Sequence, residues 1–217
     1  MKNYLDLRNK MDCKLLKEPA EIIRSGGIVI FPTETVYGIG ANGLDEKAVD
    51  KLYKVKNRPL NKPISLLVSN MEMIEKITKN ISNKEYKLMN KFFPVPFTII
   101  LKKKNIIPDI VTSGGDTVGI RMPSGEIARK LVEYANVPIA TPSANISGKP
   151  SGTNIDSIIR DFEGKVDYII DGGESKIGIA STIVQVVNEE IHILREGIIS
   201  RENVLNIWWI CYILVIR

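Results

Sequence analysis

Residues 28–68 read IVIFPTETVYGIGANGLDEKAVDKLYKVKNRPLNKPISLLV and hold two apolar runs on either side of a helical segment. The first run, Ile28–Phe31, is rich in β-branched residues and predicts a buried strand. Asp45 is placed to cap Glu46–Lys56, where apolar residues recur on one face as in an amphipathic helix. A second run, Ile64–Val68, predicts the next strand. This order of strand, helix and strand favours an α/β fold.

The alternation of strands and helices continues over the rest of the chain. Further runs rich in Ile and Val predict strands at Phe97–Lys103, Val118–Arg121, Pro138–Ala140, Val166–Ile170, Thr182–Val187 and Ile191–Leu194. Helical signals are a segment that Pro19 opens and Gly26 closes, one that Ser124 caps, one over Asn154–Phe162 and one over Ser200–Asn206. Most runs are too short to show a clean period, so the pairing order of the strands is not readable.

The composition is that of one large globular domain. The chain has 217 residues, of which 44% are hydrophobic, enough for a sizeable core, and only 6% are aromatic. Disordered, collagen-like and disulfide-scaffold classes are excluded. The first ten residues are polar, which argues against a signal peptide. The longest apolar run, Ile207–Ile216, is shorter than the roughly 20 residues that span a bilayer. We expect a cytoplasmic protein without a membrane partner.

The cysteine and histidine residues do not indicate a metal site, a redox pair or a catalytic triad. Cys13 and Cys211 lie at opposite ends of the chain, without the spacing of a zinc site or a redox pair. The lack of a disulfide framework suits a reducing compartment. The single histidine, His192, lies in a predicted strand, where a packed or edge residue is the expected role. A serine–histidine triad therefore has no available base.

Polar loops with glycines and hydroxyls follow the predicted strands and hold the candidate chemistry. Their sequences are FPTETVYGIGAN at 31–42, SGGDTVGIRMP at 113–123, IATPSANISGKPSGT at 139–153 and DGGESKIGIASTIV at 171–184. The densest cationic segment, KLYKVKNRPLNK at 51–62, carries Lys56, Arg58 and Lys62 ahead of Ser65. Phosphates need such fixed positive charge. A solvated helix end is the plainer interpretation of these cations, and an internal carboxylate partner is the plainer one for Arg121.

Hydroxyls and cations without an evident general base are typical of nucleotidyl transfer, in which positioning and charge neutralisation do most of the work. At these residues the chain resembles the YrdC-type threonylcarbamoyl-AMP synthase family. The matching stretches are GGIVIFPTETVYGIGANG, KNRPLNKPISLLV, VGIRMP, ATPSANISGKPSGT and GIASTIV followed by LREG, spread over about residues 15–200. The most specific are PTETVYG, PSANISG and the KxRxxxKxxS element at Lys56, Arg58, Lys62 and Ser65.

The resemblance implies a YrdC-like α/β fold, a twisted mixed sheet with flanking helices and a basic concave cleft, over residues 1–205. It implies the conversion of L-threonine, bicarbonate and ATP, accompanied by Mg²⁺, into L-threonylcarbamoyl-AMP and pyrophosphate. A partner complex would then transfer the threonylcarbamoyl group to adenosine in tRNA. The larger members of the family add a second domain, so this chain resembles the single-domain form.

The resemblance also implies the site residues. Residues at L-threonine positions of the family are Thr35, Leu67, Arg121, Thr141 and Ser181. Residues at ATP positions are Lys56, Arg58, Lys62, Thr117, Ser143, Asn145, Ser151 and Arg195, and of these Lys56 and Arg58 are the candidate catalytic residues. No protein-bound metal is expected.

Three positions depart from the family pattern. Leu67 stands where many members have a histidine near the threonine site, so a side-chain contact there is lost. Val95 replaces the glycine of a PGP turn, and Ala180 stands at the acidic position of GIEST. None of these changes removes a cation, so the expected activity is kept.

Two alternative functions and the role of one segment stay open. A YrdC-like module could grip double-stranded RNA or tRNA without catalysis, although hydroxyls such as Thr35, Thr141 and Ser181 favour a pocket for a small substrate. A carbamoyl-transferring relative would carry zinc-finger-like cysteines, which are missing here. The apolar tail at 206–217 could pack on the core, contact another copy or be an aberrant end.

Overall fold

The computed structural model describes residues 3–9, 11–149, 155–175 and 177–206. Its strands are β1 (Tyr4–Asp6), β2 (Val29–Pro32), β3 (Tyr37–Asn42), β4 (Leu66–Leu67), β5 (Phe97–Lys102), β6 (Thr117–Arg121), β7 (Ile139–Ala140), β8 (Tyr168–Asp171), β9 (Thr182–Val187) and β10 (Glu190–Arg195). Its helices are α1 (Lys17–Arg24), α2 (Glu46–Lys56), α3 (Met71–Ile77), α4 (Asn83–Phe92), α5 (Asp109–Thr112), α6 (Glu126–Ala135), α7 (Ile155–Phe162) and α8 (Arg201–Leu205), with a 3₁₀ turn at Cys13–Leu16.

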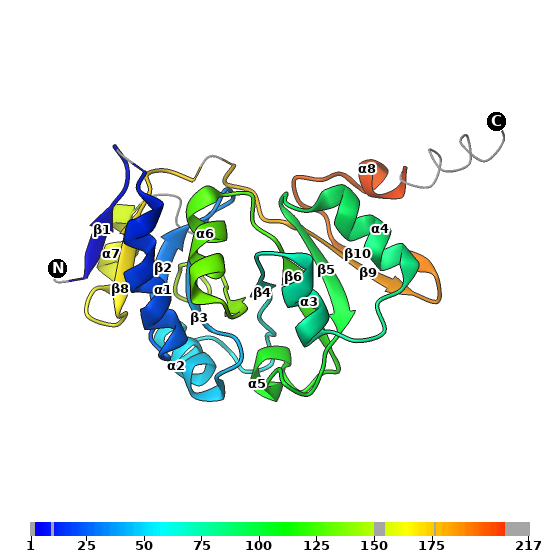
Figure 1. Ribbon diagram of the computed structural model, residues 1–217, viewed down its shortest axis with the longest axis horizontal. Helices are drawn as coiled ribbons and strands as arrows, with labels where there is room; N and C mark the ends of the chain where they lie inside the picture. Colours follow the sequence, from blue (N-terminus) through cyan, green and yellow to red (C-terminus); the bar gives the residue numbers. More distant parts are fainter. Residues whose placement is uncertain (1–2, 10, 150–154, 176, 207–217) are drawn as a thin grey trace.

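The strands of the described residues form one mixed sheet in the order β1-β8-β2-β3-β7-β4-β6-β5-β9-β10. Parallel pairs are β1–β8, β2–β8, β4–β6 and β5–β9, and the other neighbours run antiparallel. The two-residue strands β4 and β7 lie at the centre, between longer strands on both sides. The sheet is strongly twisted, with α1, α2 and α6 over its β2–β3 half and α3 and α4 over its β5–β6 half (Figure 1). The α/β class and the mixed sheet expected from the sequence are confirmed.

Aliphatic side chains dominate the core, as the low aromatic content predicts. Ile28, Ile30 and Phe31 are fully buried in the first predicted strand, and Leu52 of α2 packs against the same core. The Asp45 side chain accepts from the Lys47 and Ala48 nitrogens, so the predicted cap of α2 is confirmed. All of the predicted strands are present, with ends that differ by up to two residues.

The sequence prediction missed β3, which lies inside the stretch 31–42 that was interpreted as a polar loop. All six residues of β3 are buried. Its glycines explain the miss, because glycine disfavours strands unless a close approach requires it. A Cβ at Gly38 would lie 2.6 Å from the Thr141 methyl group, and one at Gly40 would lie 2.7 Å from the Phe31 ring.

The cap predicted for α6 is wrong. Gly125, not Ser124, occupies the N-cap position, and no side chain caps the helix there. The reason is tight packing against the segment that follows β2. A Cβ at Gly125 would lie 3.1 Å from the Glu34 nitrogen, and the Gly125 nitrogen itself donates to the Glu34 carboxylate.

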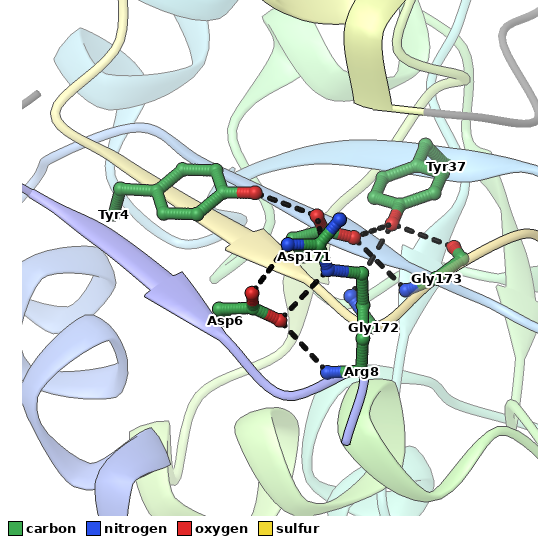
Figure 2. A network of polar contacts seen from close by, with 7 residues as sticks. All are labelled: Tyr4, Asp6, Arg8, Tyr37, Asp171, Gly172 and Gly173. Carbon is green, nitrogen blue, oxygen red and sulfur yellow. Dashed lines mark hydrogen bonds and ion pairs between the residues drawn. The ribbon is translucent and has the colours of Figure 1, made fainter. Parts of the chain in front are cut away.

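The buried carboxylate of Asp171, in β8, links the N-terminal strand β1 to Tyr37 of β3 (Figure 2). It accepts from the Tyr4 hydroxyl at 2.6 Å and the Tyr37 hydroxyl at 3.1 Å, and its Oδ2 lies 3.3 Å from Arg8 Nε. The Gly173 nitrogen donates to the same carboxylate. Desolvation and the Asp171 charge raise the pKa values of Tyr4 and Tyr37, so both phenols remain protonated donors.

Within the described residues, no helix is long and apolar enough to cross a membrane. The helix expected over Ser200–Asn206 is confirmed as α8, capped by the Ser200 hydroxyl. The tail from Ile207 onward lies outside the described residues, so the three explanations offered for it stay open.

Candidate active site

A cavity of about 630 Å³ lies at the centre of the sheet and receives side chains from both halves of it. The short strand β4 contributes Leu67 to its wall, and the neighbouring strands contribute residues at or beyond their ends. Eight of the residues expected from the family resemblance line the cavity: Thr35, Arg58, Leu67, Arg121, Thr141, Ser143, Ser181 and Arg195. Loops that are far apart in the sequence thus meet in one place.

The wall of the cavity is cationic and rich in hydroxyls. It contains three arginines, and its described residues include no aspartate or glutamate. A cluster of guanidinium groups of this kind attracts an anion. Within 3–9, 11–149, 155–175 and 177–206, no group of three or more His, Cys, Asp and Glu side chains could hold a metal ion.

Arg121, the last residue of β6, lines the cavity and forms an ion pair with a carboxylate that does not line it. Its Nη2 donates to Glu34 Oε1 at 2.5 Å and to the Thr35 hydroxyl at 3.0 Å. Both side chains of the ion pair are largely buried. The internal acid considered as the plainer explanation for Arg121 is therefore present, and it is Glu34. This pairing leaves the buried Nε of Arg121 without a hydrogen-bond partner among the described residues.

Arg195 enters the opposite side of the cavity from the end of β10. Its Nε and Nη2 donate to the Ser181 carbonyl at 3.0 and 2.8 Å, and Nη2 also lies 3.1 Å from the Ser181 hydroxyl. That hydroxyl in turn shares a hydrogen bond of 2.8 Å with Thr98. Partial burial and the positive charge of Arg121 lower the pKa of Arg195. The guanidinium groups of Arg121 and Arg195 therefore repel one another across the cavity.

Arg58 lies in the loop that follows α2. The helix ends at Asn57, which adopts the left-handed conformation with φ of 50°. Arg58 Nε donates to the Lys62 carbonyl at 3.0 Å and Nη2 to the Pro63 carbonyl at 2.8 Å. The guanidinium also lies 5.9 Å from the centre of the Tyr53 ring. The loop thus holds Arg58 in one orientation.

Lys56 is fully buried and does not line the cavity. Its Nζ donates to the Ser143 carbonyl at 2.5 Å and to the Asn145 carbonyl, and its own carbonyl accepts from the Ser147 nitrogen. Desolvation, followed by the charge of Arg58, lowers the pKa of Lys56 to about 7. The residue thus fastens α2 to the loop that presents Ser143, which points to a positioning role.

The remaining candidates lie away from the cavity wall. Lys62 is exposed, and Thr117 begins β6 opposite Lys102. Asn145 accepts from the Ser143 hydroxyl and donates to two nearby carbonyls, so it shapes the loop. Ser151 lies outside the described residues. His192 is exposed on the edge strand β10, as an edge role predicts.

The sequence analysis missed Glu34, Thr98 and Tyr37. Glu34 stands inside the quoted PTETVYG motif but was not assigned a role. Thr98 is buried and lines the cavity, yet in the run FTIILK it has the ordinary appearance of a β-branched strand residue. The partner of Thr98, Ser181, is 83 positions away, so no local signal could have indicated it.

The three departures from the family pattern fall in different places. Leu67 is buried in the cavity wall, where it offers an apolar contact, and Ala180 also lines the cavity. Val95 lies instead beside a separate apolar hollow near α8. The loss of glycine at 95 is therefore remote from the candidate site.

A twisted mixed sheet with a central cavity walled by arginines and hydroxyls defines an α/β protein suited to small anionic ligands. The chain belongs to the Sua5, YciO and YrdC family, whose model carries the description "Telomere recombination" and matches residues 21–197.

Relatives with names that state an activity support this membership. A threonylcarbamoyl-AMP synthase of Pyrococcus abyssi is 42% identical, over 92% of this chain and 59% of that protein. A putative threonylcarbamoyl-AMP synthase of Methanocaldococcus jannaschii is 46% identical, over 86% of this chain and 87% of that protein. The crystal structure of P. abyssi Sua5 complexed with L-threonine superposes with a TM-score of 0.91 at 41% identity, over 94% of this chain and 60% of that one. This chain thus spans about three fifths of the P. abyssi relative.

Proposed function

We propose that this chain is an L-threonylcarbamoyladenylate synthase, a nucleotidyltransferase that forms L-threonylcarbamoyl-AMP and pyrophosphate from L-threonine, bicarbonate and ATP. The observation that carries the proposal is the central cavity, which joins three arginines to the hydroxyls of Thr35, Thr141 and Ser181. The L-threonine complex of the P. abyssi relative, which shares the fold at a TM-score of 0.91, supports it.

The amino-acid half of the cavity lies around Arg121. In our proposal its guanidinium binds the threonine carboxylate, while Thr35, Thr141 and Ser181 bind the amine and the side-chain hydroxyl. Leu67 contacts the methyl group. The nucleotide half lies around Arg58 and Arg195, whose charges neutralise the phosphates, with Ser143 as a further hydrogen-bonding group. Lys62, Thr117, Asn145 and Ser151 are further ATP-binding residues in our proposal, on the strength of the family resemblance.

The substrates supply both nucleophiles, so the protein needs no catalytic triad. The threonine amine adds to CO₂ with loss of a proton, or to bicarbonate with loss of water, and gives a carbamate. A carbamate oxygen then attacks the α-phosphorus of ATP as pyrophosphate leaves. Arg58 and Arg195 stabilise the charge that develops on the phosphate oxygens. In our proposal Mg²⁺ accompanies ATP as part of the MgATP substrate, as the family resemblance implies. The product would serve a separate complex that transfers the threonylcarbamoyl group to tRNA.

The direct test is incubation with ATP, Mg²⁺, bicarbonate and labelled threonine, followed by chromatography of the products. We expect threonylcarbamoyl-AMP and pyrophosphate in equal amounts. Serine, which lacks one methyl group, should react about 10–200-fold less efficiently, and valine, which lacks the hydroxyl, less efficiently still. A folded protein that binds tRNA but forms no product would instead support the non-catalytic RNA-binding module. Equal turnover of valine and threonine would contradict the roles of Thr35, Thr141 and Ser181.

A further inference from the structure

The ion pair between Glu34 and Arg121 is built into the frame of the cavity. Glu34 Oε1 accepts from Arg121, and Oε2 accepts from the Gly125 nitrogen at 3.2 Å, at the start of α6. The positive end of the α6 dipole favours a carboxylate at this position. The main chain of Glu34 is fixed as well, because its carbonyl accepts from the Ile177 nitrogen at 3.1 Å. The exposed fractions of the two side chains are 10% for Glu34 and 13% for Arg121.

Because of this ion pair, the positive charge in the cavity wall is compensated at Arg121 and not at the other two arginines. Of the three arginines in its wall, Arg121 alone has a carboxylate partner among the described residues. Arg58 donates to carbonyl groups, and Arg195 donates to the carbonyl and hydroxyl of Ser181, so both keep their full positive charge. One half of the cavity is therefore electrically balanced and the other is strongly positive.

We propose that Glu34 is a positioning and specificity-determining residue that sorts the two substrates between these halves. This inference rests on the proposed function. A balanced guanidinium still donates hydrogen bonds to a single carboxylate, but it is a weak site for a polyphosphate, whose binding needs uncompensated charge. Glu34 thus keeps Arg121 for the amino acid and leaves the phosphates to Arg58 and Arg195.

Glu34→Gln tests the proposal because it removes the charge and nearly keeps the shape. The binding of L-threonine and of inorganic pyrophosphate is measured by calorimetry on the full chain. We expect threonine affinity to fall about tenfold or more, since Arg121 loses a charge-assisted partner that orients it. We expect pyrophosphate affinity to rise about fivefold or more, because two neighbouring guanidinium groups are then uncompensated. Glu133→Gln, at an exposed ion pair with Lys130, is the matched control and should change neither affinity.

The opposite directions of the two changes separate sorting from a merely structural role. A loss of both affinities, or no change in either, would overturn the proposal. Glu34→Asp keeps the charge but is too short to reach both Arg121 and Gly125, so it should weaken threonine binding without strengthening pyrophosphate binding. This variant decides the matter if Glu34→Gln fails to fold. Calorimetry measures binding without catalysis, so it tests the sorting role separately from the proposed function. A wild-type protein that binds both ligands without forming product refutes only the proposed function. A wild-type protein that does not bind threonine refutes the sorting role too.

Discussion

Arg58 is oriented before any ligand arrives, because two carbonyl groups of its own loop hold the guanidinium at the cavity wall. If it binds phosphate oxygens, Arg58→Ala removes a charge-assisted hydrogen bond worth about 1.5–3 kcal/mol and lowers kcat/KM by roughly 10–150-fold. Arg58→Lys should recover only part of the loss, because lysine lacks the planar fork. Product formation and thermal unfolding measured in parallel check this. Near wild-type kcat/KM for both variants would move the phosphate site away from this loop.

Lys56 makes the stability of the protein depend on pH. Its pKa in the folded protein is about 7, below the 10.5 of an unperturbed lysine, so the unfolded chain binds more protons between these values. The contribution of Lys56 to the free energy of unfolding therefore rises as the pH increases from about 7 toward 10.5. Relative to Lys56→Met, which cannot titrate there, the wild-type protein should gain up to about 1.4 kcal/mol per pH unit. Urea unfolding at pH 6.5, 8 and 9.5 measures this difference, and a constant value would contradict the shift.

At the scale of elements, the segment after β10 packs closely against the segment that leads into β9. This close packing is possible because Gly197 has no side chain. A Cβ there would lie 2.2 Å from the Ala180 carbonyl oxygen. Gly197→Ala should push apart the segments that carry Arg195 and Ser181, destabilise the fold by about 1–3 kcal/mol and weaken ATP binding. Calorimetry and thermal unfolding measure both effects. Gly164→Asn is the control, since nothing lies within 4 Å of that site and Asn tolerates its φ of 74°. An unchanged ATP affinity in Gly197→Ala would contradict the role given to this contact.

Elements with a local signal could be predicted from the sequence, and elements defined by distant partners could not. The cap at Asp45 gave the bounds of α2 correctly. The capping box of Ser82 and Glu85 at the start of α4 was equally readable and was overlooked. By contrast, β1 has only three residues and a partner strand at the other end of the domain, so no window of sequence indicates it.

The same distinction holds for the candidate site. Loops rich in cations and hydroxyls indicated most of the residues that the cavity brings together. The burial of Lys56 could not be predicted, because it depends on a loop whose Ser143 carbonyl is 87 positions away. The pairing of Arg121 with Glu34, also 87 positions away, likewise exists only after the sheet has formed.

At the scale of the whole molecule, Asp171 ties the first strand to the cavity. Tyr4 and Tyr37 both donate to its carboxylate, and Tyr37 also lines the cavity. Tyr4→Phe should lower the free energy of unfolding by about 1.5–3 kcal/mol, because it removes a hydrogen bond to a buried charge. In a double-mutant cycle with Tyr37→Phe, the two losses should not add, since both phenols serve one carboxylate. Chemical unfolding of the four proteins gives the coupling energy, and simple additivity would show that the phenols act independently.

The pairing of β1 with β8 also bears on how the protein is made. Tyr4 and Asp171 are 167 positions apart, so a ribosome that adds roughly 5–20 residues per second completes Asp171 about 8–30 s after Tyr4. During that interval the first strand has emerged but has no partner, while β2, β3 and α2 can already associate. The nascent chain therefore carries an unpaired strand through most of its synthesis, and β1 joins the edge of the sheet only after β8 has left the exit tunnel.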